Sequence, residues 1–461
     1  MYTVFCMNIS EDFFSFLKLQ PQLFFIDRFL KTFPQADLFL VGGAVRDLLL
    51  HRDVKNADYD FVICNLSVPE IEAWFATQGS IERAGKNFEV FKFLPKGFHV
   101  SNTRFIDITL PRTESPLPNS LGGYRDFETQ SDPSLPIEND LMRRDFTVNA
   151  MAFNFRTREL IDPYHGQADL KTKTLRAVGN PADRFQEDLT RILRGIRFAA
   201  ELSFEIESHT WDAMIHNVPR LNRMRKEEGK NEFVVARETI GEELSKSLLA
   251  NPQITIKLLL ESRALEELFP SVWRHAKIDE HYLDPLLKLL PVPNGTHMEH
   301  AIILLLRELT EEEAKTTLSF TGLSTISKQS LRRVESDRVL WIIQKLAQTL
   351  THGDVTTMRA SQFEKQFMSE HGKLHLEILK HMGKDQILNA AHKRRDEICT
   401  RWKCEEHEPI PTLLSGEDII RLGIPEGMRV RELIEEVRDK QLDGHLLSRE
   451  AALDWVRKQI N

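Results

Sequence analysis

The stretch that decides the fold is LFLVGGAVRDLLLHRDVKNADYDFVICN, from Leu38 to Asn65. It opens with an apolar run, breaks at Gly42-Gly43, turns helical around Arg46 and ends in a second apolar run. Glycines between a strand and a helix let backbone N–H groups approach a phosphate, and the dipole of the helix N-terminus adds to the attraction. We therefore predict a strand, a phosphate-binding turn, a helix and a second strand, with Arg46 and Lys55 as cations that pair with phosphate oxygens.

Alternate carboxylates stand where the second apolar run begins, at Asp58 and Asp60. Two side chains at this spacing on a strand project from the same face, about 6.5–7 Å apart. Such a pair can hold two hard cations, with Mg²⁺ preferring oxygen ligands, and two metals stabilise both oxygens exchanged in phosphoryl transfer. We expect a third carboxylate, Asp107 in FIDITL, from a neighbouring strand. An isolated Asp-X-Asp more often only ends a surface strand, so the glycine turn upstream is what favours the metal site.

Length and composition are typical of a soluble protein of more than one domain. The chain has 461 residues, of which 41% are hydrophobic and 28% charged, with a net charge of −8. No uncharged apolar stretch approaches the ~18 residues that a membrane span needs, and Glu11 and Asp12 stand where a signal peptide would be basic, then apolar. Four cysteines indicate a reducing compartment without a disulfide framework. We expect a cytoplasmic protein that does not associate with membranes.

The pattern along the chain predicts a β-rich beginning and a helical remainder. Four runs read as strands, LFLVGG, YDFVIC, FEVFKFL and TRFIDITL, and helical text lies between them. From about residue 176 onward apolar residues recur at helical spacing, without a strand run of comparable quality. The expected parts are an N-terminal helical extension (1–35), a head (36–175), a neck (176–262), a body (263–407) and a tail (408–461).

A long polar segment, residues 111–140, interrupts the head. It is rich in Pro, Ser, Gly and Asn, which predicts a loop. Loops of this length in compact domains tend to be functional. A tolerated surface insertion is the alternative.

Several motifs in order resemble one family. GGAVRD followed by DYD, then RRDFTVNAMAF (143–153), IDPYHGQADL (161–170) and EDLTRILRGIRFAAEL (187–202), resemble class II nucleotidyltransferases, as, more loosely, does RETIGEELSKSL (237–248). This family comprises tRNA nucleotidyltransferases (CCA-adding enzymes and their CC- and A-adding relatives) and bacterial poly(A) polymerases. The segment 415–444 also resembles the C-terminal part of the bacterial tRNA enzymes. The resemblance covers about half of the chain. It implies an α+β fold: a polymerase β-like head with a mixed sheet, then an all-helical neck, body and tail.

The resemblance also implies how a base is selected. On a predicted helix, Asp188 and Arg191 lie three residues apart on one face. Asp accepts hydrogen bonds and Arg only donates them, which complements the amine and ring nitrogen of cytosine and adenine but opposes guanine and uracil. An ordinary helix salt bridge is the alternative. Arg194 and Arg197 continue the stripe, either as a solvated face or as a phosphate and RNA-backbone surface. Arg144 and Asp145 match the family segment that contacts the ribose.

The expected activity is template-independent addition of CCA, or of its terminal A, to tRNA 3′ ends from CTP and ATP, with Mg²⁺ as cofactor and release of pyrophosphate. The 111–140 segment resembles the flexible loop of relatives that add the terminal A, which leaves full CCA addition and A-only addition both open. The neck-to-tail helices are expected to hold the acceptor arm and elbow of tRNA by backbone contacts and shape. A bacterial poly(A) polymerase is the second candidate, and a catalytically inactive RNA-binding scaffold is a candidate of another class.

Overall fold

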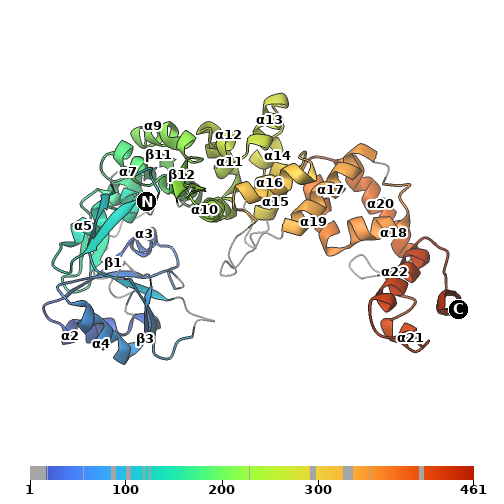
Figure 1. Ribbon diagram of the computed structural model, residues 1–461, viewed down its shortest axis with the longest axis horizontal. Coiled ribbons are helices and arrows are strands. Elements are labelled where there is room, and N and C mark those ends of the chain that lie inside the picture. The colour runs from blue at the N-terminus through green and yellow to red at the C-terminus, as the bar shows by residue number, and fades with distance from the viewer. Residues whose placement is uncertain are drawn as a thin grey trace, which may run out of the picture. The chain divides into compact units, whose positions relative to one another are not determined.

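The computed structural model describes Leu17 and residues 19–55, 57–84, 90–99, 105–117, 120–123, 126–227, 229–290, 297–324, 336–352, 355–403 and 410–460. The chain divides into two compact units, Met1–Leu268 and Phe269–Asn461. The first unit holds the expected head and neck, and the described residues of the second are helical or lie in connections between helices (Figure 1).

A seven-stranded mixed sheet forms the centre of the head, in the order β3-β4-β5-β2-β1-β8-β9. Every neighbouring pair is antiparallel except β2 and β5, which run parallel. The strands are β1 (Asp37–Val41), β2 (Asp60–Cys64), β3 (Gly79–Ala84), β4 (Val90–Pro95), β5 (Ile106–Thr109), β8 (Ala152–Asn154) and β9 (Glu159–Ile161). The four runs that the sequence predicts as strands are β1, β2, β4 and β5, so this prediction is confirmed.

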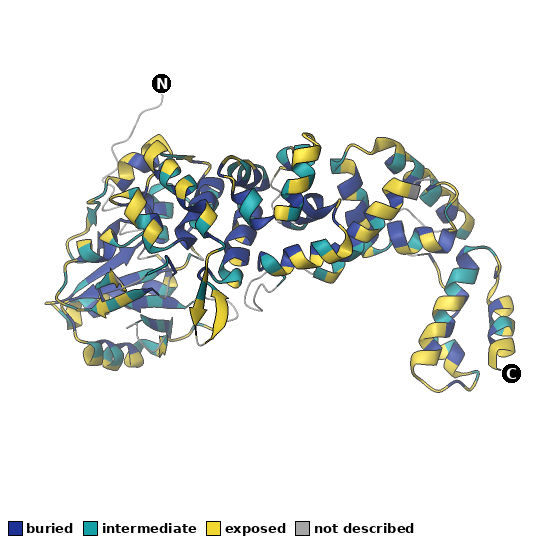
Figure 2. Ribbon diagram, turned by 45° about the horizontal axis from the view of Figure 1, so that its top comes forward, coloured by how far each residue is buried: buried dark blue, intermediate teal, exposed yellow. Residues whose placement is uncertain are grey.

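Side chains alternate between the two faces of the central strands, and each face has its own core. One face carries a cluster of aromatic rings in which Phe25 contacts Phe61, Phe75 and Phe93 at ring-centroid distances of 5.3–5.8 Å. The helices over this face, side by side in Figure 1, are α2 (Ile26–Thr32) and α4 (Val68–Gln78). Residues 17–35 thus contribute to the core of the head as far as they are described; residues 1–16 lie outside the described part. The buried interior of the sheet is dark blue in Figure 2.

The opposite face of the sheet supports the elements that build the site. Val41 and Val62 pack there against Leu141 and Ala150. The elements on this side of the head and at its end are α3 (Gly43–Leu49), α5 (Ile137–Met142), η2 (Thr147–Asn149), α6 (Gly166–Thr172) and β10 (Thr174–Leu175).

The polar segment 111–140 is not a loop throughout, and that prediction is wrong for both of its ends. Strands β6 (Arg112–Pro116) and β7 (Phe127–Ser131) pair in an antiparallel ribbon, and α5 begins inside the segment. The Asn- and Gly-rich part between the two strands does hold a turn, where the carboxylate of Asp126 accepts hydrogen bonds from the N–H groups of Leu121 and Gly123. Residues 118–119 and 124–125 lie outside the described residues.

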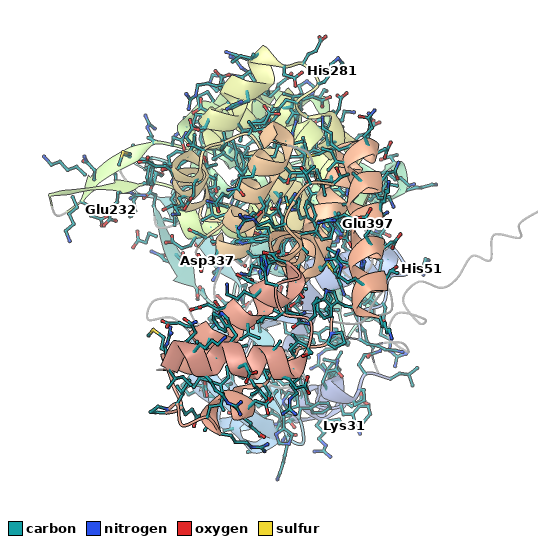
Figure 3. The ribbon with its side chains drawn as sticks, turned by 90° about the vertical axis from the view of Figure 1, so that its right-hand side faces the viewer. Lys31, His51, Glu232, His281, Asp337 and Glu397 are labelled. Carbon is teal, nitrogen blue, oxygen red and sulfur yellow. The ribbon has the colours of Figure 1, made fainter. Side chains whose placement is uncertain are left out.

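The neck is helical apart from one hairpin and one short strand, which corrects the expectation of helices alone. A two-stranded hairpin, β12 (Met224–Glu227) and β13 (Lys230–Phe233), stands out from it, with Glu232 labelled in Figure 3. A two-residue strand, β11 (Glu205–Ile206), also pairs with β10. The helices are α7 (Pro181–Glu187), α8 (Thr190–Leu202), α9 (Ser208–Asn217), η3 (Val218–Arg220), α10 (Arg237–Ala250), α11 (Pro252–Glu261) and α12 (Ala264–Leu268).

The described residues of the second unit contain no strand. They form α13 (Pro270–Ile278), α14 (Asp284–Leu287), α15 (His297–Leu306), α16 (Glu311–Phe320), α17 (Ser336–His352), α18 (Ala360–Phe363), η4 (Glu364–Met368), α19 (Glu370–His381), α20 (Asp385–Trp402), α21 (Gly416–Ile420), α22 (Met428–Leu442) and α23 (Arg449–Ile460). Across the described part of the chain, no helix combines the length and apolar character that crossing a membrane requires.

A capping box starts the last group of helices. The hydroxyl of Ser415 accepts from the N–H of Asp418 at 3.3 Å, and the carboxylate of Asp418 accepts from the N–H of Ser415 at 2.9 Å. We expect Ser415→Ala to lower the free energy of unfolding by about 1 kcal/mol. Chemical denaturation of the full chain measures this, and Ser319→Ala, at an exposed position inside α16, is the control. An effect of Ser415→Ala no larger than that of the control would contradict the prediction.

Candidate active site

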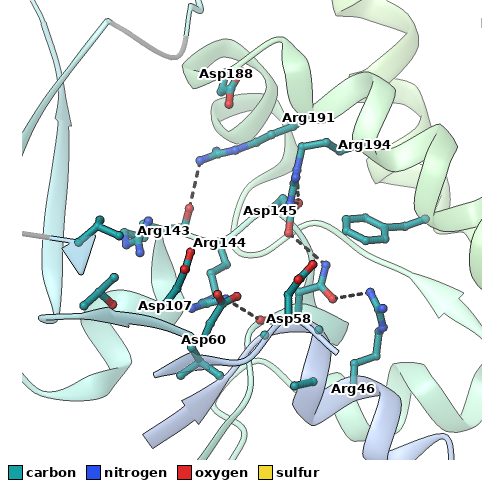
Figure 4. Close-up of a pocket in the computed structure, with 18 of the residues that line it drawn as sticks. Arg46, Asp58, Asp60, Asp107, Arg143, Arg144, Asp145, Asp188, Arg191 and Arg194 are labelled. Carbon is teal, nitrogen blue, oxygen red and sulfur yellow. Dashed lines mark hydrogen bonds and ion pairs between the residues drawn. The ribbon is translucent and has the colours of Figure 1, made fainter. Parts of the chain in front are cut away.

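The three predicted carboxylates line one cavity of about 930 Å³ in the first unit. Asp60 is the first residue of β2, and its Cα partner on the parallel strand β5 is Asp107. Asp58 lies two residues before Asp60 and lines the same cavity (Figure 4). The side chains of neighbours in register point to the same face of a sheet, so the strand pairing itself brings Asp60 and Asp107 together.

This group of carboxylates has the electrostatics of a cation site. Burial, together with the nearby charges of Asp107 and Asp58, raises the pKa of Asp60 to about 6, although Arg144 and Lys92 act in the opposite direction. The ammonium group of Lys92 lies 2.6 Å from both carboxylate oxygens of Asp107. The described residues hold no ready-made group of three metal ligands. A hard divalent cation nevertheless takes oxygen ligands of this kind and would relieve the repulsion, so the chemistry of these carboxylates suits a metal.

The raised pKa predicts how stability and metal binding depend on pH. An aspartate whose pKa rises on folding contributes stability below its unfolded pKa, and this contribution is lost as the pH rises through about 6. We therefore expect Asp60→Asn to raise the melting temperature in a chelator at pH 8 relative to the wild type, but not at pH 4. Below pH 6, divalent-cation binding to the wild type should release a proton, because metal ligands must be deprotonated.

Thermal denaturation at both pH values checks the stability difference, and calorimetry in buffers of different ionisation enthalpy counts the proton. A difference between wild type and variant that does not change with pH would contradict the assignment.

The glycine turn lies where the sequence predicts it, between β1 and α3. Gly42 has a φ of +74°, which favours glycine, and a Cβ there would lie 2.8 Å from Nη1 of Arg144. The N–H of Gly42 donates to the carbonyl of Met151 at 3.3 Å. Gly42 and Gly43 both line the cavity, so the turn lets the backbone lie close to Arg144 and to the carboxylates.

The two cations predicted from the opening stretch have different positions. The side chain of Arg46 is 5% exposed and lines the cavity, where it pairs with Asp47 and Glu201 and donates to Asn149 at 3.0 Å. Lys55 is exposed and is not among the residues that line the cavity; its N–H donates to Asp53. The structure therefore brings Arg46, but not Lys55, to the carboxylates.

Arg144 and Asp145 line the cavity, and acidic or basic partners hold both side chains in place. Arg144 donates to the fully buried carboxylate of Asp140 at 3.0 Å. Oδ2 of Asp145 accepts from Nε of Arg194 at 2.7 Å, and Oδ1 accepts from the N–H of Phe146. Burial alone would raise the pKa of Asp145, but Arg194 outweighs it and holds the pKa at about 2. Asp145 is therefore a permanent anion that fixes Arg194.

Asp188 and Arg191 do not lie on one helix, which corrects the sequence prediction. Asp188 is extended and separates α7 from α8, and its Oδ1 accepts from the N–H and the hydroxyl of Thr190 at 2.8 and 2.6 Å. A carboxylate that bonds the backbone two residues on competes with the helix, which explains the break. Asp188 and Arg191 nevertheless both line the cavity, on the side facing the carboxylates of the sheet (Figure 4).

Each arginine of the α8 stripe has an acidic partner. Nη1 of Arg191 donates to Glu187 at 2.7 Å, and Nη2 donates to the carbonyl of Arg143 at 3.0 Å. Arg197 donates to Glu243 at 2.7 Å, while Arg194 pairs with Asp145. All three arginines line the cavity, so this stripe is not a solvated face.

The sequence reasoning missed Asp140, whose carboxylate holds both Arg143 and Arg144. The signal was available, because Asp140 stands three and four residues before these arginines in a helical text. It also missed Glu187 as the partner of Arg191.

Residues 38–176 match the family model described as the poly(A) polymerase head domain. The head of the chain is therefore similar to the heads of class II nucleotidyltransferases. A CCA-adding enzyme of Blochmanniella floridana is 36% identical over 238 residues, which are 51% of this chain and 50% of that protein. The matched region thus spans about half the length of the curated relatives. Nucleotidyltransferases of this kind imply the use of divalent metal ions, and carboxylate oxygens such as those of Asp60 and Asp107 are of the type that these ions take.

Solved structures of this class extend the likeness in fold to nearly the whole chain. The Bacillus stearothermophilus CCA-adding enzyme in complex with CTP has a TM-score of 0.63 at 20% identity and covers 96% of this chain and 98% of its own. The Thermotoga maritima CCA-adding enzyme complexed with tRNA has a TM-score of 0.58 at 22% identity, with 98% of each chain covered. The α+β head followed by a predominantly helical remainder is therefore the fold of class II CCA-adding enzymes, as predicted.

Proposed function

We propose that this protein is a tRNA nucleotidyltransferase that adds CCA, or its terminal A, to tRNA 3′ ends from CTP and ATP. The observation that carries the proposal is one cavity lined from two sides: Asp60 begins β2, with Asp58 two residues before it, and Asp188 and Arg191 belong to the α7–α8 junction. Carboxylates for metals on one side and a hydrogen-bonding pair on the other suit a nucleoside triphosphate.

The roles follow from charge and position. Asp58 and Asp60, assisted by Asp107, would hold Mg²⁺ ions, which supply Lewis-acid stabilisation of the attacking and leaving oxygens. Gly42 and Gly43 let the triphosphate approach the backbone. Among the arginines of the cavity wall, Arg194 has the more exposed side chain, at 36%, against 5% for Arg46, which favours Arg194 as the phosphate ligand and Arg46 as the brace of the turn.

The ribose would lie near Arg144 and Asp145. A carboxylate that stays ionised accepts a hydrogen bond from a 2′-hydroxyl, and deoxyribose lacks that donor. Asp145, with its pKa of about 2, is such an acceptor. Arg197, which lies over the ring of Phe198 at 4.1 Å, completes the cationic wall.

Base selection follows from the donors and acceptors of one pair of side chains. The contacts of Asp188 with Thr190 use Oδ1, which leaves Oδ2 to a ligand. It can accept from the exocyclic amine of cytosine or adenine, while Arg191 donates to the adjacent ring nitrogen. Uracil and guanine present the opposite pattern, and each unpaired buried group costs about 1–3 kcal/mol.

The RNA partner is tRNA, held at its acceptor arm and elbow. The relative from Thermotoga maritima is named as a complex with tRNA. The helices of the second unit would provide backbone and shape contacts of the kind that RNA helices require.

One assay tests the proposal. The purified chain is incubated with Mg²⁺, CTP or ATP, and transcripts of one tRNA that end before CCA, after C or after CC. Growth of the shortest transcript to mature length supports full CCA addition, and extension of the CC-ending transcript alone identifies an A-adding enzyme. Long A tails on unrelated RNA would instead show a poly(A) polymerase. No incorporation with any transcript would overturn the proposal and favour an RNA-binding scaffold.

A further inference from the structure

A partly buried ion pair joins the neck hairpin to the turn between β6 and β7. Asp126 is 5% exposed, and its Oδ1 accepts from Nη1 of Arg225, on β12, at 2.6 Å. Its Oδ2 accepts from the N–H groups of Leu121 and Gly123 at 2.8 and 2.9 Å. Burial alone would raise the pKa of Asp126, but these N–H groups and the guanidinium outweigh it and lower the pKa. One carboxylate thus fixes both ends of the turn 121–123.

The turn 121–123 is in direct contact with the junction of α7 and α8. The N–H of Leu189 donates to the carbonyl of Gly122 at 2.9 Å. A Cβ on Gly122, whose φ is +91°, would lie 2.9 Å from Cγ of Leu189 and 3.0 Å from the carbonyl of Gln186. Since there is no free space between them, a shift of the turn moves the junction.

The junction is the place where Asp188 stands. The peptide group that donates to Gly122 is the one that joins Asp188 to Leu189. Thr190 holds the carboxylate of Asp188 from the helix side. The contacts that set the orientation of Asp188 therefore include one within α8 and one from the turn, besides its backbone hydrogen bonds with Arg184 and Arg191. Asp126 and Arg225 are not among the residues that line the cavity, so neither is placed to touch a nucleotide.

We propose that Arg225 and Asp126 are positioning residues for base selection: the ion pair fixes the turn, and the turn fixes Asp188 through Leu189. This inference rests on the proposed function of the cavity. It assigns a role to the neck hairpin, which stands out from the helices around it (Figure 3). A small displacement of a group that orients substrate is enough to change a rate strongly.

The test compares Arg225→Gln and Asp126→Asn with Lys226→Gln. Lys226 is an exposed cation on the same strand, so its variant removes the same charge without breaking the ion pair. The kcat/KM for CTP is measured on a tRNA ending before CCA, and that for ATP on a tRNA ending in CC. We expect the ratio of the two values to change about tenfold in both ion-pair variants and to stay constant in Lys226→Gln. Arg225→Lys, which keeps the charge, should restore the ratio in part.

A second readout separates this inference from the proposed function. Equilibrium binding of CTP, ATP, UTP and GTP to the free protein is measured for each variant. If the wild type adds nothing to tRNA, the proposed function fails, and the binding ratios alone then decide on the ion pair. Equal loss for all nucleotides, or unchanged ratios, would show a purely structural role and overturn the inference. If Arg225→Gln does not fold, Asp126→Asn and Arg225→Lys give the same comparison.

Discussion

Replacement of Asp58 or Asp60 by Asn is expected to lower nucleotide addition by about a thousandfold or more, because metal ions contribute several kcal/mol of charge stabilisation and each 1.36 kcal/mol corresponds to a factor of ten. Both carboxylates line the cavity, and Asp60 stands opposite Asp107 in the strand register. Asparagine keeps the shape of the side chain but removes the charge that holds a cation.

The loss should be one of rate rather than of folding. Asp60→Asn is expected to raise stability in a chelator at pH 8, since the buried charge of Asp60 is unfavourable there. Asp53→Asn is the matched control, because Asp53 is an exposed carboxylate of the same segment that accepts from the N–H of Lys55. Single-turnover rates on a tRNA ending in CC measure the effect. Rates of Asp58→Asn or Asp60→Asn within tenfold of the control would contradict the assignment.

Replacement of Asp188 by Asn is expected to lower the preference for CTP and ATP over UTP and GTP by about tenfold to a hundredfold. The amide oxygen still accepts from the N–H and hydroxyl of Thr190, so the break between α7 and α8 is kept. The amide nitrogen, however, presents a donor where Asp188 presents an acceptor. It opposes the amine of cytosine or adenine and complements the carbonyl of uracil or guanine.

Incorporation from each of the four nucleotides on the tRNA ending before CCA measures this preference. Asp183→Asn is the control, because Asp183 is an exposed residue of α7, the helix that ends just before Asp188. If Asp188→Asn lowers the rate with all four nucleotides by one factor, Asp188 supports the junction without reading the base.

The sequence predicted the parts of the head that depend on local patterns. The apolar runs of β1 and β2 are separated by a glycine turn and a helical pattern. Such an apolar run can be recognised as a strand without knowledge of the strands that pair with it. Asp107 could be expected beside Asp60 because FIDITL alternates apolar and polar residues, as a strand does. The register of β2 and β5 confirms that these two residues are partners. Asp58 and Asp60 share the cavity as well, but Asp58 precedes the first residue of β2, so the prediction that both stand on one strand is wrong for Asp58.

The structure differs from the sequence prediction mainly where a side chain has a partner distant in sequence, or where a strand consists of polar residues. Arg46 is held by Glu201, 155 residues away, and no local pattern indicates such a pair. The neck hairpin consists almost entirely of polar residues, so it lacks the apolar alternation that marks a strand. The break at Asp188 did have a local signal: an Asp two residues before a Thr at a helix start is a capping pattern.

The relation between metals and base is tested most directly by a crystal structure of the chain with Mn²⁺ and a non-hydrolysable CTP analogue. Our account predicts anomalous scattering peaks within coordination distance of Asp58 and Asp60, the amine of cytosine hydrogen-bonded to Asp188, and its ring nitrogen hydrogen-bonded to Arg191. Metal bound away from both aspartates, or a cytosine edge that faces solvent, would contradict it.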